Sequence, residues 1–444
     1  MKPQLQSVVK LLQESGALSS PSIQSALRIS QPTVSRILSE LEDEVFTFGS
    51  ARATRYALGH SIGTMPAQQP IWGVGADGMA SRLGDLTFLA RSQIHIGADG
   101  VNETFDVTSK DPLPWILSGL RPQGFLGRLL AQRMATSAYS ANPDTWSVEE
   151  VLVAACQTHD APGALLLGTS MSTKLDAQIK ISATNPGPDL DRLSADVAKT
   201  LPAGSSAGGE QPKLLAFNDA GASFIVKFSA PRGTPYGDRW TDLLVCESIA
   251  ALTLNDCGMD AAQNEIVQTD TRTYLLSRRF DRIGATGRKH VVSVGSAHFE
   301  FCKGTYVNWA ATCSDLARQN RLSKEDAETA LAILMFGRLI GNSDMHSGNA
   351  GLFVEGGSLR EMMGGRFSLA PVYDMLPMRW KPDAMMGMFP YEPFEADYSM
   401  ASNEVRCAAQ SFWKRVAGHP LISQELQGIA LEMSFRMGAD GLVR

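Results

Sequence analysis

The sequence predicts a protein of the α+β class with three parts: a small helical module that ends in a hairpin, a sheet-containing lobe and a mainly helical lobe. Three observations predict this organisation. Apolar residues recur at helical spacing over residues 5–41, and two short alternating runs follow them. Further along, ASFIVKF alternates as a strand does. Finally, a long apolar run ends at the polar stretch GNSDMHSGN, and helical texture returns near the C-terminus in NEVRCAAQSFWKRVAG.

Bulk composition is typical of a water-soluble globular chain. Of 444 residues, 44% are hydrophobic and 19% are charged, which suits two or three domains with at least one large core. A net charge of -6 argues against a basic coat over the whole surface. The six cysteines form no C-x-x-C pair, so a zinc knuckle or a disulfide framework is not expected. The start lacks a signal-peptide layout and the longest apolar run, LAILMFGRLI, contains Arg338, so we expect a cytoplasmic protein without membrane contact.

Residues 1–58 predict three helices and a hairpin. The first helix is expected to end at Gly16, and the second to begin with Ser20 as N-cap and Pro21 in its first turn. The buried stripe of the third helix is expected to consist of Val34, Ile37, Leu38 and Leu41. The runs VFTF and ARATRYAL, on either side of a Gly-Ser turn, predict the hairpin. This order of elements resembles the winged helix-turn-helix family.

That resemblance predicts a DNA-binding surface on this module. Short polar side chains and arginines suit base edges and phosphates; the candidates are Gln31, Thr33, Ser35 and Arg36 on the third helix and Arg52 and Arg55 on the wing. The alternative is a protein-interaction module, because basic and acidic residues nearly balance in this segment. Residues 59–72, with the stretch GHSIGTMPAQQP, predict a linker.

The predicted sheet-containing lobe, residues 73–285, includes a glycine-rich stretch. In LPAGSSAGGEQPK, the glycines at positions 204, 208 and 209 make a loop whose backbone N–H groups suit phosphate. The loop is not of the Walker A type, since no Lys-Ser/Thr pair follows its last glycine. Taken alone, this stretch favours an ordinary surface loop.

A strand lysine and a helix glutamate provide a more specific signal. In ASFIVKF, Phe224 and Val226 alternate with Lys227, which places the lysine on the opposite face of the strand. In the following helix, Glu247 lies within an apolar stripe, where an unpaired carboxylate would cost several kcal/mol. Lys227 is the partner we expect, and kinases use such a pair to hold the lysine against nucleotide phosphates.

The mainly helical lobe, residues 286–444, contains the polar stretch noted above. Asp344 and Asn349 have the spacing of the base aspartate and metal-binding asparagine in a kinase catalytic loop. Asp374 follows the apolar run in RFSLAPVYDML, where a second metal-binding carboxylate belongs. The order of glycine-rich loop, lysine, glutamate and these polar residues is far more specific than any one of them.

Five motifs, SAGGEQPK, FIVKF, RRFDR, GNSDMHSGN and PVYD, resemble the HipA family of bacterial serine/threonine kinase toxins. The resemblance spans residues 73–444 and implies a two-lobed kinase-like fold that uses ATP and Mg²⁺. It implies phosphorylation of a cellular protein, with an aminoacyl-tRNA synthetase as one candidate, and inhibition of growth. It also implies a partner, a small helix-turn-helix antitoxin. Because this chain carries a DNA-reader-like module of its own, we expect it to bind its own promoter, with or without such a partner.

The resemblance assigns roles to individual residues. Asp344 is similar to the catalytic aspartate that orients or deprotonates the acceptor hydroxyl, and Asn349 and Asp374 are similar to the Mg²⁺ ligands. Lys227 and Lys213 correspond to two lysines that contact ATP. The remaining correspondences are Glu247 as the partner of the strand lysine, His346 as a phosphate contact, Phe280 as the adenine-gripping hinge residue and Ser206 as the site of autophosphorylation.

Three assignments leave alternatives. His346 could instead stabilise its own loop, and Ser205 is adjacent to Ser206 and could be the modified residue. Family members often carry glutamate two residues before the hinge phenylalanine, where this chain has Arg278. Two other functions also remain: a DNA-binding transcriptional regulator whose kinase-like part senses a ligand, and a metal-dependent nuclease. The nuclease would need hard metal ligands but no Lys227–Glu247 pair.

Overall fold

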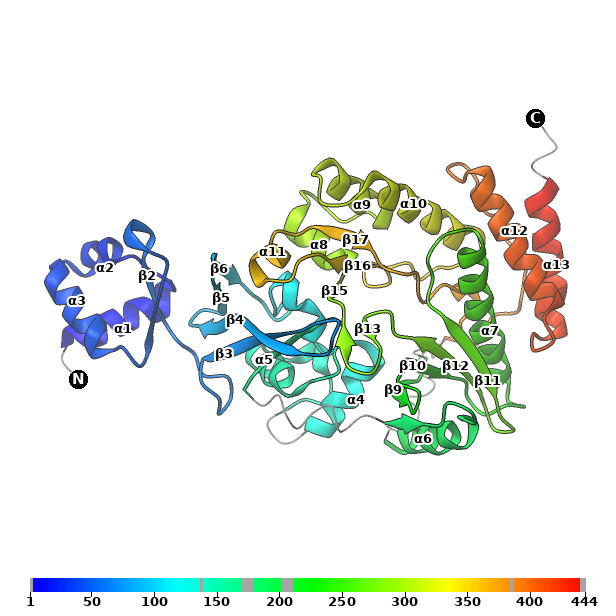
Figure 1. Cartoon of the computed structure of the whole chain (residues 1–444), viewed down its shortest axis with the longest axis horizontal. Coiled ribbons are helices and arrows are strands. Elements are labelled where there is room, and N and C mark those ends of the chain that lie inside the picture. The colour runs from blue at the N-terminus through cyan, green and yellow to red at the C-terminus, as the bar shows by residue number, and fades with distance from the viewer. Residues whose placement is uncertain (1–2, 136–138, 170–178, 201–210, 384–386, 440–444) are drawn as a thin grey trace.

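A computed structural model describes residues 3–135, 139–169, 179–200, 211–383 and 387–439. The chain has a mixed α+β fold, with the N-terminal module at one end of the molecule and the last two helices at the other (Figure 1). Two five-stranded sheets and a helical region lie between these ends. Within the described residues, no helix has the length and apolar character needed to cross a membrane.

The N-terminal module contains three helices and a two-stranded antiparallel sheet. Its elements are α1 (Pro3–Ser15), α2 (Ser20–Leu27), α3 (Gln31–Glu40), β1 (Val45–Phe48) and β2 (Arg55–Leu58). Apolar residues of all three helices form one small core, which includes Leu5, Val8, Leu12, Ile23, Val34, Ile37 and Leu38. Helical spacing therefore predicted the buried faces here.

Two details of this module differ from the sequence expectation. The N-cap of α2 is Ser19, whose side chain accepts a hydrogen bond from the Ser22 amide, so the expected cap at Ser20 is one residue late. Both residues are serine, so the sequence could not show which of them directly precedes the first turn of the helix. The hairpin turn is also longer than a Gly-Ser pair, because Ala51–Ala53 form a short 3₁₀ turn before β2.

The segment after the module is bound to the first sheet along part of its length. Gly59 pairs with Leu89, and the His60 amide donates to the Phe88 carbonyl at 2.8 Å. Phe48 of the hairpin also stacks on His95, with ring centroids 4.2 Å apart. Strand β3 starts at Gln68, inside the range 59–72 for which the sequence suggested a linker.

The first large sheet is antiparallel, with the strand order β6-β5-β4-β3-β7. Its strands are β3 (Gln68–Val74), β4 (Ala80–Leu89), β5 (Gln93–Ala98), β6 (Val101–Asp106) and β7 (Leu165–Leu167). Helices α4 (Gly124–Met134) and α5 (Val148–Gln157) and the 3₁₀ segments Trp115–Leu120 and Pro143–Thr145 accompany it. Its core is continuous with apolar residues of a later part of the chain, among them Val294, Cys313, Leu352 and Phe367.

The second large sheet has the order β11-β12-β10-β9-β8, and only its β8–β9 pair is parallel. Its strands are β8 (Lys180–Ile181), β9 (Lys213–Asn218), β10 (Ser223–Phe228), β11 (Asn264–Gln268) and β12 (Thr273–Arg278). Helix α6 (Gly187–Thr200) belongs to this part, and α7 (Pro235–Asp256) follows β10. The range 73–285, expected as one lobe, thus contains two sheets with separate cores.

The remainder of the chain combines helices with short strands. The strands are β13 (Arg282–Ile283), β14 (Gly287–Arg288), β15 (Val291–Ser293), β16 (Gly351–Val354) and β17 (Phe367–Leu369), the last three forming one sheet. The helices are α8 (Val294–Phe301), α9 (Trp309–Arg318), α10 (Lys324–Leu339), α11 (Leu359–Met363), α12 (Asn403–Gly418) and α13 (Gln424–Ala439), with a 3₁₀ turn at Met378–Trp380.

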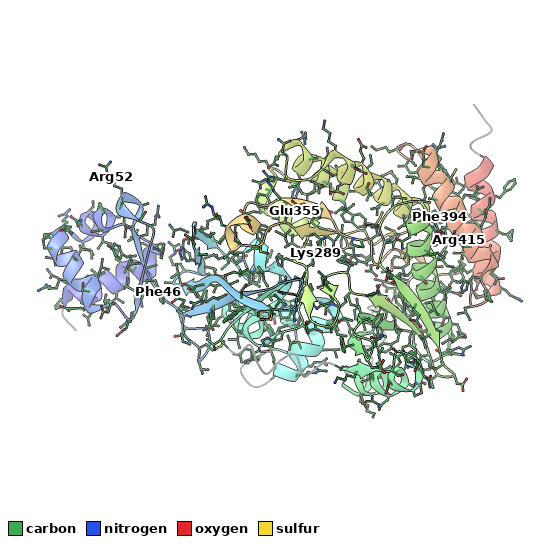
Figure 2. All side chains as sticks on the ribbon, viewed as in Figure 1. Phe46, Arg52, Lys289, Glu355, Phe394 and Arg415 are labelled. Atoms are coloured by element: carbon green, nitrogen blue, oxygen red, sulfur yellow. The ribbon has the colours of Figure 1, made fainter. Side chains whose placement is uncertain are left out.

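Helices α7, α10, α12 and α13 share an aliphatic and aromatic core. Phe394 lies within this helical region (Figure 2) and contacts Trp413 of α12 edge to face. Arg415 of α12, also labelled in Figure 2, binds Asp256 at the end of α7 at 2.6 Å. Because α7 also packs on the second sheet, it connects that sheet to the helical core.

Candidate phosphoryl-transfer site

Lys227 of β10 is bonded to two carboxylates from distant parts of the chain. Its Nζ atom lies 2.7 Å from both Glu247 oxygens and 2.5 Å from Oδ1 of Asp374. The side chains of Lys227 and Glu247 are 7% and 3% exposed, and that of Asp374 is 20% exposed. One ammonium group therefore joins the second sheet, helix α7 and the segment that follows β17.

Local sequence explains why these groups meet. On β10, Phe224 and Val226 face the apolar core of the second sheet, so the alternation turns Lys227 to the opposite face. On α7, Glu247 lies one turn after Leu243 and Leu244, both fully buried, which carries the carboxylate toward the sheet. Ion pairs this buried stabilise a fold only when their geometry is good, whereas the loss of one partner costs about 3–5 kcal/mol.

Burial and charge act in opposite directions on these groups. Burial disfavours the charged lysine, yet the carboxylates of Asp374 and Glu247 raise the pKa of Lys227 above its ordinary value. Burial likewise opposes ionisation of Asp374, but Lys227 and Lys213 lower its pKa to about 2. For Glu247, burial outweighs the attraction of Lys227 and raises the pKa. Lys213 pairs with Lys227 across the β9–β10 ladder, and burial together with this neighbour lowers its own pKa.

The polar stretch GNSDMHSGN begins directly after α10. Ser323 caps the start of α10 by accepting a hydrogen bond from the Asp326 amide, and the helix ends at Leu339. Gly341 then adopts a left-handed conformation with φ 79°, and a Cβ atom there would approach Arg379 and Phe394 within about 3 Å. A glycine at this position lets the chain turn out of the apolar helix into the loop.

Asn342 connects this loop to the segment that carries Asp374. Its side chain is buried; Oδ1 accepts from the Asp344 amide at 3.0 Å, and Nδ2 donates to the Asp374 carbonyl at 3.4 Å. The residue thus sets the spacing between two aspartates that lie 30 positions apart in the chain. Asn342 belongs to the GNSDMHSGN stretch, but its spacing gave no reason to distinguish it from an ordinary turn residue.

Asn349 folds back onto the same loop. Its Nδ2 donates to the Asp344 carbonyl at 2.8 Å, which leaves its amide oxygen free to accept a ligand. Asp374 has a left-handed backbone, with φ 57°, an uncommon conformation for aspartate that turns its carboxylate toward Lys227. The oxygen atoms of Asn349 and Asp374 are hard donors of the kind that Mg²⁺ prefers.

The donor set fits a metal that is bound mainly through phosphate and water. Within the described ranges, no group of three or more His, Cys, Asp and Glu side chains forms a metal-binding cluster. Mg²⁺ in kinases commonly uses one or two protein carboxylates together with phosphate oxygens, so a full cage of protein ligands is not required.

His346 and the expected hinge residue lie around this loop. His346 accepts a hydrogen bond at its Nδ1 from the Gly348 amide of the same loop. Phe280 lies 5.7 Å from the ring of Tyr373, the residue before Asp374. Tyr373 in turn donates its hydroxyl to the Gly348 carbonyl. Tyr373 therefore links Phe280 to the GNSDMHSGN loop.

The outcomes differ for the glycine-rich stretch and for Arg278. Ser205, Ser206 and the glycines of the preceding stretch lie outside the described residues. Arg278, which occupies the position of the family glutamate, is exposed, and its guanidinium donates to Gln263 at 3.3 Å.

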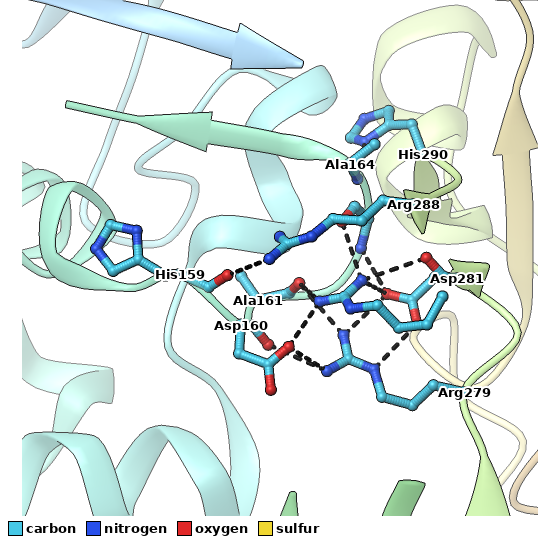
Figure 3. Close-up of polar contacts among 10 residues, drawn as sticks. His159, Asp160, Ala161, Ala164, Arg279, Asp281, Arg288 and His290 are labelled. Carbon is cyan, nitrogen blue, oxygen red and sulfur yellow. Dashed lines mark hydrogen bonds and ion pairs between the residues drawn. The ribbon is translucent and has the colours of Figure 1, made fainter. Parts of the chain in front are cut away.

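A buried ion cluster joins the RRFDR segment, where the sequence predicts the hinge, to the loop before β7 (Figure 3). Arg279 donates two hydrogen bonds to the Asp281 carboxylate, both at 3.0 Å, and one to the Asp160 carboxylate at 2.7 Å. Arg282 bonds the same two aspartates, each at 2.8 Å. Arg288 donates to the His159 carbonyl at 2.7 Å. The RRFDR motif served only as a mark of family resemblance, and its structural function depends on Asp160, far away in sequence.

Replacing Asp281 with Asn is expected to destabilise the fold by about 3–5 kcal/mol near neutral pH. Burial opposes ionisation of Asp281, but Arg279 and Arg282 lower its pKa from 3.8 to about 2. A carboxyl group whose pKa is lower in the folded protein than in the unfolded chain stabilises the fold above about pH 4. This contribution is lost as the pH falls through about 2. The difference between wild type and variant in urea unfolding should therefore shrink below about pH 4.

Asp85→Asn supplies the matched control for this experiment. Asp85 pairs with Arg82, whose side chain is 57% exposed, so the loss should stay below about 1 kcal/mol. Equal destabilisation by the two variants, or a difference independent of pH, would contradict the account of the hinge cluster.

The six candidate DNA-contacting residues lie on the outer surface of the N-terminal module. Gln31, Ser35 and Arg36 are exposed on α3, whereas Thr33 is half-buried and its hydroxyl bonds Ser30 at 2.9 Å. Arg52 and Arg55 are also exposed, and Figure 2 shows Arg52 at the tip of the hairpin, pointing away from the remaining chain. The structure brings these residues to one module, far from Lys227.

A strand lysine held by a helix glutamate, opposite a loop with aspartate and asparagine, defines a site of the kinase-like class. Comparison with known proteins agrees. Residues 205–430 match the model of the HipA-like C-terminal domain, and residues 65–175 match that of the YjjJ-like toxin middle domain. The chain is 34% identical over 439 residues to toxin YjjJ of Escherichia coli K12, covering 94% of each. The chain therefore belongs to the HipA-like toxin family.

A solved structure supports the same fold. The HipA toxin of Shewanella oneidensis MR-1, from a complex with HipB and its operator DNA, superposes with a TM-score of 0.53. The match covers 83% of this chain and 96% of the other, at 16% sequence identity. At this identity the likeness establishes the fold alone. The YjjJ-like middle-domain model covers the strands of the first large sheet, and the HipA-like model covers β9 to β12 of the second.

Proposed function

We propose that this protein is an ATP- and Mg²⁺-dependent protein serine/threonine kinase that acts as a growth-inhibiting toxin. The observation that carries the proposal is Lys227, held between Glu247 and Asp374 beside the Asp344–Asn349 loop. A nuclease would require the hard oxygen ligands but would gain nothing from a lysine locked to a helix glutamate.

Each residue has a definite task in this proposal. Lys227 and Lys213 bind the phosphates of ATP, while Phe280 packs beside the adenine. Asn349 and Asp374 would hold Mg²⁺, and the ion would supply positive charge that stabilises the phosphate being transferred. Asp344 orients the acceptor serine or threonine hydroxyl and takes its proton as the oxygen attacks the γ-phosphorus. A phosphate ester forms, the bond to the β-phosphate oxygen breaks, and ADP leaves.

The glycine-rich stretch is proposed to contain the autophosphorylation site at Ser206. In this proposal the added phosphate displaces the loop and switches the kinase off, as in the family that the sequence resembles. Incubation of the purified full chain with γ-labelled ATP and Mg²⁺, followed by peptide mass spectrometry, should find phosphate on Ser206. Matched Ser205→Ala and Ser206→Ala variants separate the two neighbours, because only the second should lose the label.

The same incubation tests the kinase proposal as a whole. The expected result is transfer that requires both ATP and a divalent cation. Tight ATP binding without transfer to itself or to cellular proteins would instead support a ligand-sensing regulator. Nicking of plasmid DNA by Mg²⁺ without ATP would support the nuclease.

We further propose that the N-terminal module is a winged helix-turn-helix domain that binds DNA, including the promoter of its own gene. Support comes from the exposed polar face of α3 and from the exposed wing arginines. The related Shewanella toxin was solved in a complex with HipB and operator DNA. A separate antitoxin therefore remains a proposed partner, alongside the protein substrate.

Arg36→Ala is expected to weaken binding of the full chain to its own upstream DNA by roughly tenfold or more. If Arg36 contacts phosphate, the salt dependence of binding should fall by about one unit of slope. Gel-shift titrations at several salt concentrations measure both quantities. Lys10→Ala is the control, because Lys10 is an exposed base on α1 that faces Glu14. An equal loss of DNA affinity in both variants, or no binding of this DNA by the wild-type chain, would contradict the DNA-binding proposal.

A further inference from the structure

The loop that contains Asp344 and Asn349 receives a hydrogen bond from Trp309, a residue of helix α9. The indole Nε1 of Trp309 donates to the main-chain carbonyl of His346 at 2.8 Å. The same carbonyl accepts a hydrogen bond from the amide of Asn349 at 3.0 Å. Both lone pairs of this carbonyl are therefore in use, one for the turn of the loop itself and one for the bond to α9.

The start of α9 fixes the position of the indole ring. Asn308 is the N-cap of this helix, and its Oδ1 atom accepts a hydrogen bond from the Ala311 amide at 2.9 Å. Trp309 follows as the first helical residue; it is 2% exposed and belongs to the apolar core shared by α7, α10, α12 and α13. Helix α9 also packs against α10, the helix that leads into the loop (Figure 1). The indole N–H is therefore held by a capped helix and a packed ring.

Packing alone does not hold this side of the loop in place. A small cavity is lined by Trp309, Asn349 and Val372, together with other residues of α9, α10, β16 and β17. Atoms that line a void lack van der Waals partners on that side, so the void resists a shift of the loop less than a filled core would. A hydrogen bond is directional. The bond from the indole is therefore the contact that sets the position of the His346 carbonyl relative to α9.

A shift of the His346 carbonyl would be transmitted to both functional side chains of the loop. The amide of Asn349 donates to that carbonyl, and the side chain of Asn349 donates to the Asp344 carbonyl at 2.8 Å. The proposed base and one proposed metal ligand are thus connected to the same short turn. A misplacement of about 1 Å at a reacting group can lower a rate by roughly 100-fold.

We propose that Trp309 is a positioning residue of the phosphoryl-transfer site, which holds the turn from Asp344 to Asn349 in its active geometry through the His346 carbonyl. This inference rests on the proposed kinase function and adds to it a residue outside the five motifs of the family resemblance. Local sequence did not distinguish Trp309 from an ordinary core tryptophan, because the acceptor of its N–H lies 37 positions further along the chain.

Three variants separate the hydrogen bond from the packing of the ring. Trp309→Phe keeps a buried aromatic ring but removes the N–H donor. Trp309→His keeps a donor, because the imidazole Nε2 is as many bonds from Cβ as the indole Nε1, but it loses more apolar contact. Trp146→Phe is the matched control: Trp146 is 1% exposed, lies in the core of the first large sheet and donates its Nε1 hydrogen to the Ser140 carbonyl at 2.8 Å.

Autophosphorylation of the purified full chain with γ-labelled ATP, measured over a range of ATP concentrations, tests the proposal. Trp309→Phe should lower the maximal rate by roughly 10- to 100-fold. Its half-saturating ATP concentration should stay within about twofold of wild type, because other residues bind the nucleotide. Trp309→His should recover part of the rate although urea unfolds it more readily than Trp309→Phe. Trp146→Phe should keep the wild-type rate.

Amide hydrogen exchange provides a second readout, which does not depend on the histidine variant. The Asn349 amide, which donates to the His346 carbonyl, should exchange faster in Trp309→Phe than in Trp146→Phe. A merely structural tryptophan would lower global stability in both variants without this local difference.

Two results would overturn the inference. One is a maximal rate in Trp309→Phe equal to that in Trp146→Phe. The other is a rate that follows stability, with Trp309→His slower than Trp309→Phe, which would mean that the ring acts only by filling the core. Absence of label on the wild-type chain would contradict the proposed kinase function itself, so the two failures are distinguishable.

Discussion

Asp344→Asn is expected to lower the rate of phosphoryl transfer by about 10²- to 10⁴-fold while leaving the fold and ATP affinity close to wild type. In the proposed mechanism the carboxylate accepts the proton of the attacking hydroxyl, a role that an amide cannot take. The backbone of Asp344 is held by Asn342 and Asn349, so the change should not disturb the loop. Initial rates with γ-labelled ATP, thermal unfolding and nucleotide titration measure the three quantities.

Asp270→Asn is the matched control, since Asp270 lies exposed in the turn between β11 and β12. It should transfer phosphate at the wild-type rate. Wild-type transfer by Asp344→Asn would mean that another group serves as the base or that none is needed. A loss of ATP affinity in step with the rate would mean that Asp344 acts in binding instead.

Lys227→Met is expected to abolish transfer and to destabilise the chain by about 3–5 kcal/mol. The substitution removes the cation that Glu247 and Asp374 share and leaves two buried carboxylates without it. Urea unfolding at neutral pH measures the loss. Because acid protonates those carboxylates, the variant should approach wild-type stability as the pH is lowered.

Lys213→Met tests whether a cation at the site is needed for nucleotide binding without being needed for the stability of the fold. Among the described residues Lys213 forms no such direct ion pair, and burial lowers its pKa, so replacing it should leave stability unchanged or slightly higher. Its ATP affinity should nevertheless fall, because one phosphate-binding cation is lost. Comparable destabilisation by both substitutions would contradict the assignment of Lys227 as the shared partner of the two carboxylates.

Local patterns predicted those features that depend on a few neighbouring residues. The alternation around Lys227 and the apolar stripe around Glu247 were sufficient to propose their pairing, because each periodicity defines a face. The apolar faces of the three N-terminal helices followed from the same rule. Caps and turns were less certain: Ser19 and Ser20 are chemically identical, and the 3₁₀ turn at Ala51–Ala53 has no distinctive composition.

Long-range pairing was beyond local patterns. The two sheets could not be told apart in sequence, because strands such as Lys180–Ile181 and Leu165–Leu167 are too short to carry a period. The core shared by Ile71 and Leu352 joins segments almost 300 residues apart. For the same reason, the contacts of Asn342 with the Asp374 segment and of Asp160 with the hinge arginines became visible only in three dimensions.

The most direct test of the account is a crystal structure of the full chain with Mn²⁺ and a non-hydrolysable ATP analogue. The account predicts one anomalous Mn²⁺ peak at about 2.0–2.3 Å from an Asp374 carboxylate oxygen and the Asn349 amide oxygen. It also predicts the triphosphate beside Lys227 and Lys213, with Asp344 facing the γ-phosphate. A nucleotide bound elsewhere, or metal density away from Asn349 and Asp374, would contradict the central claim that these residues form one phosphoryl-transfer site.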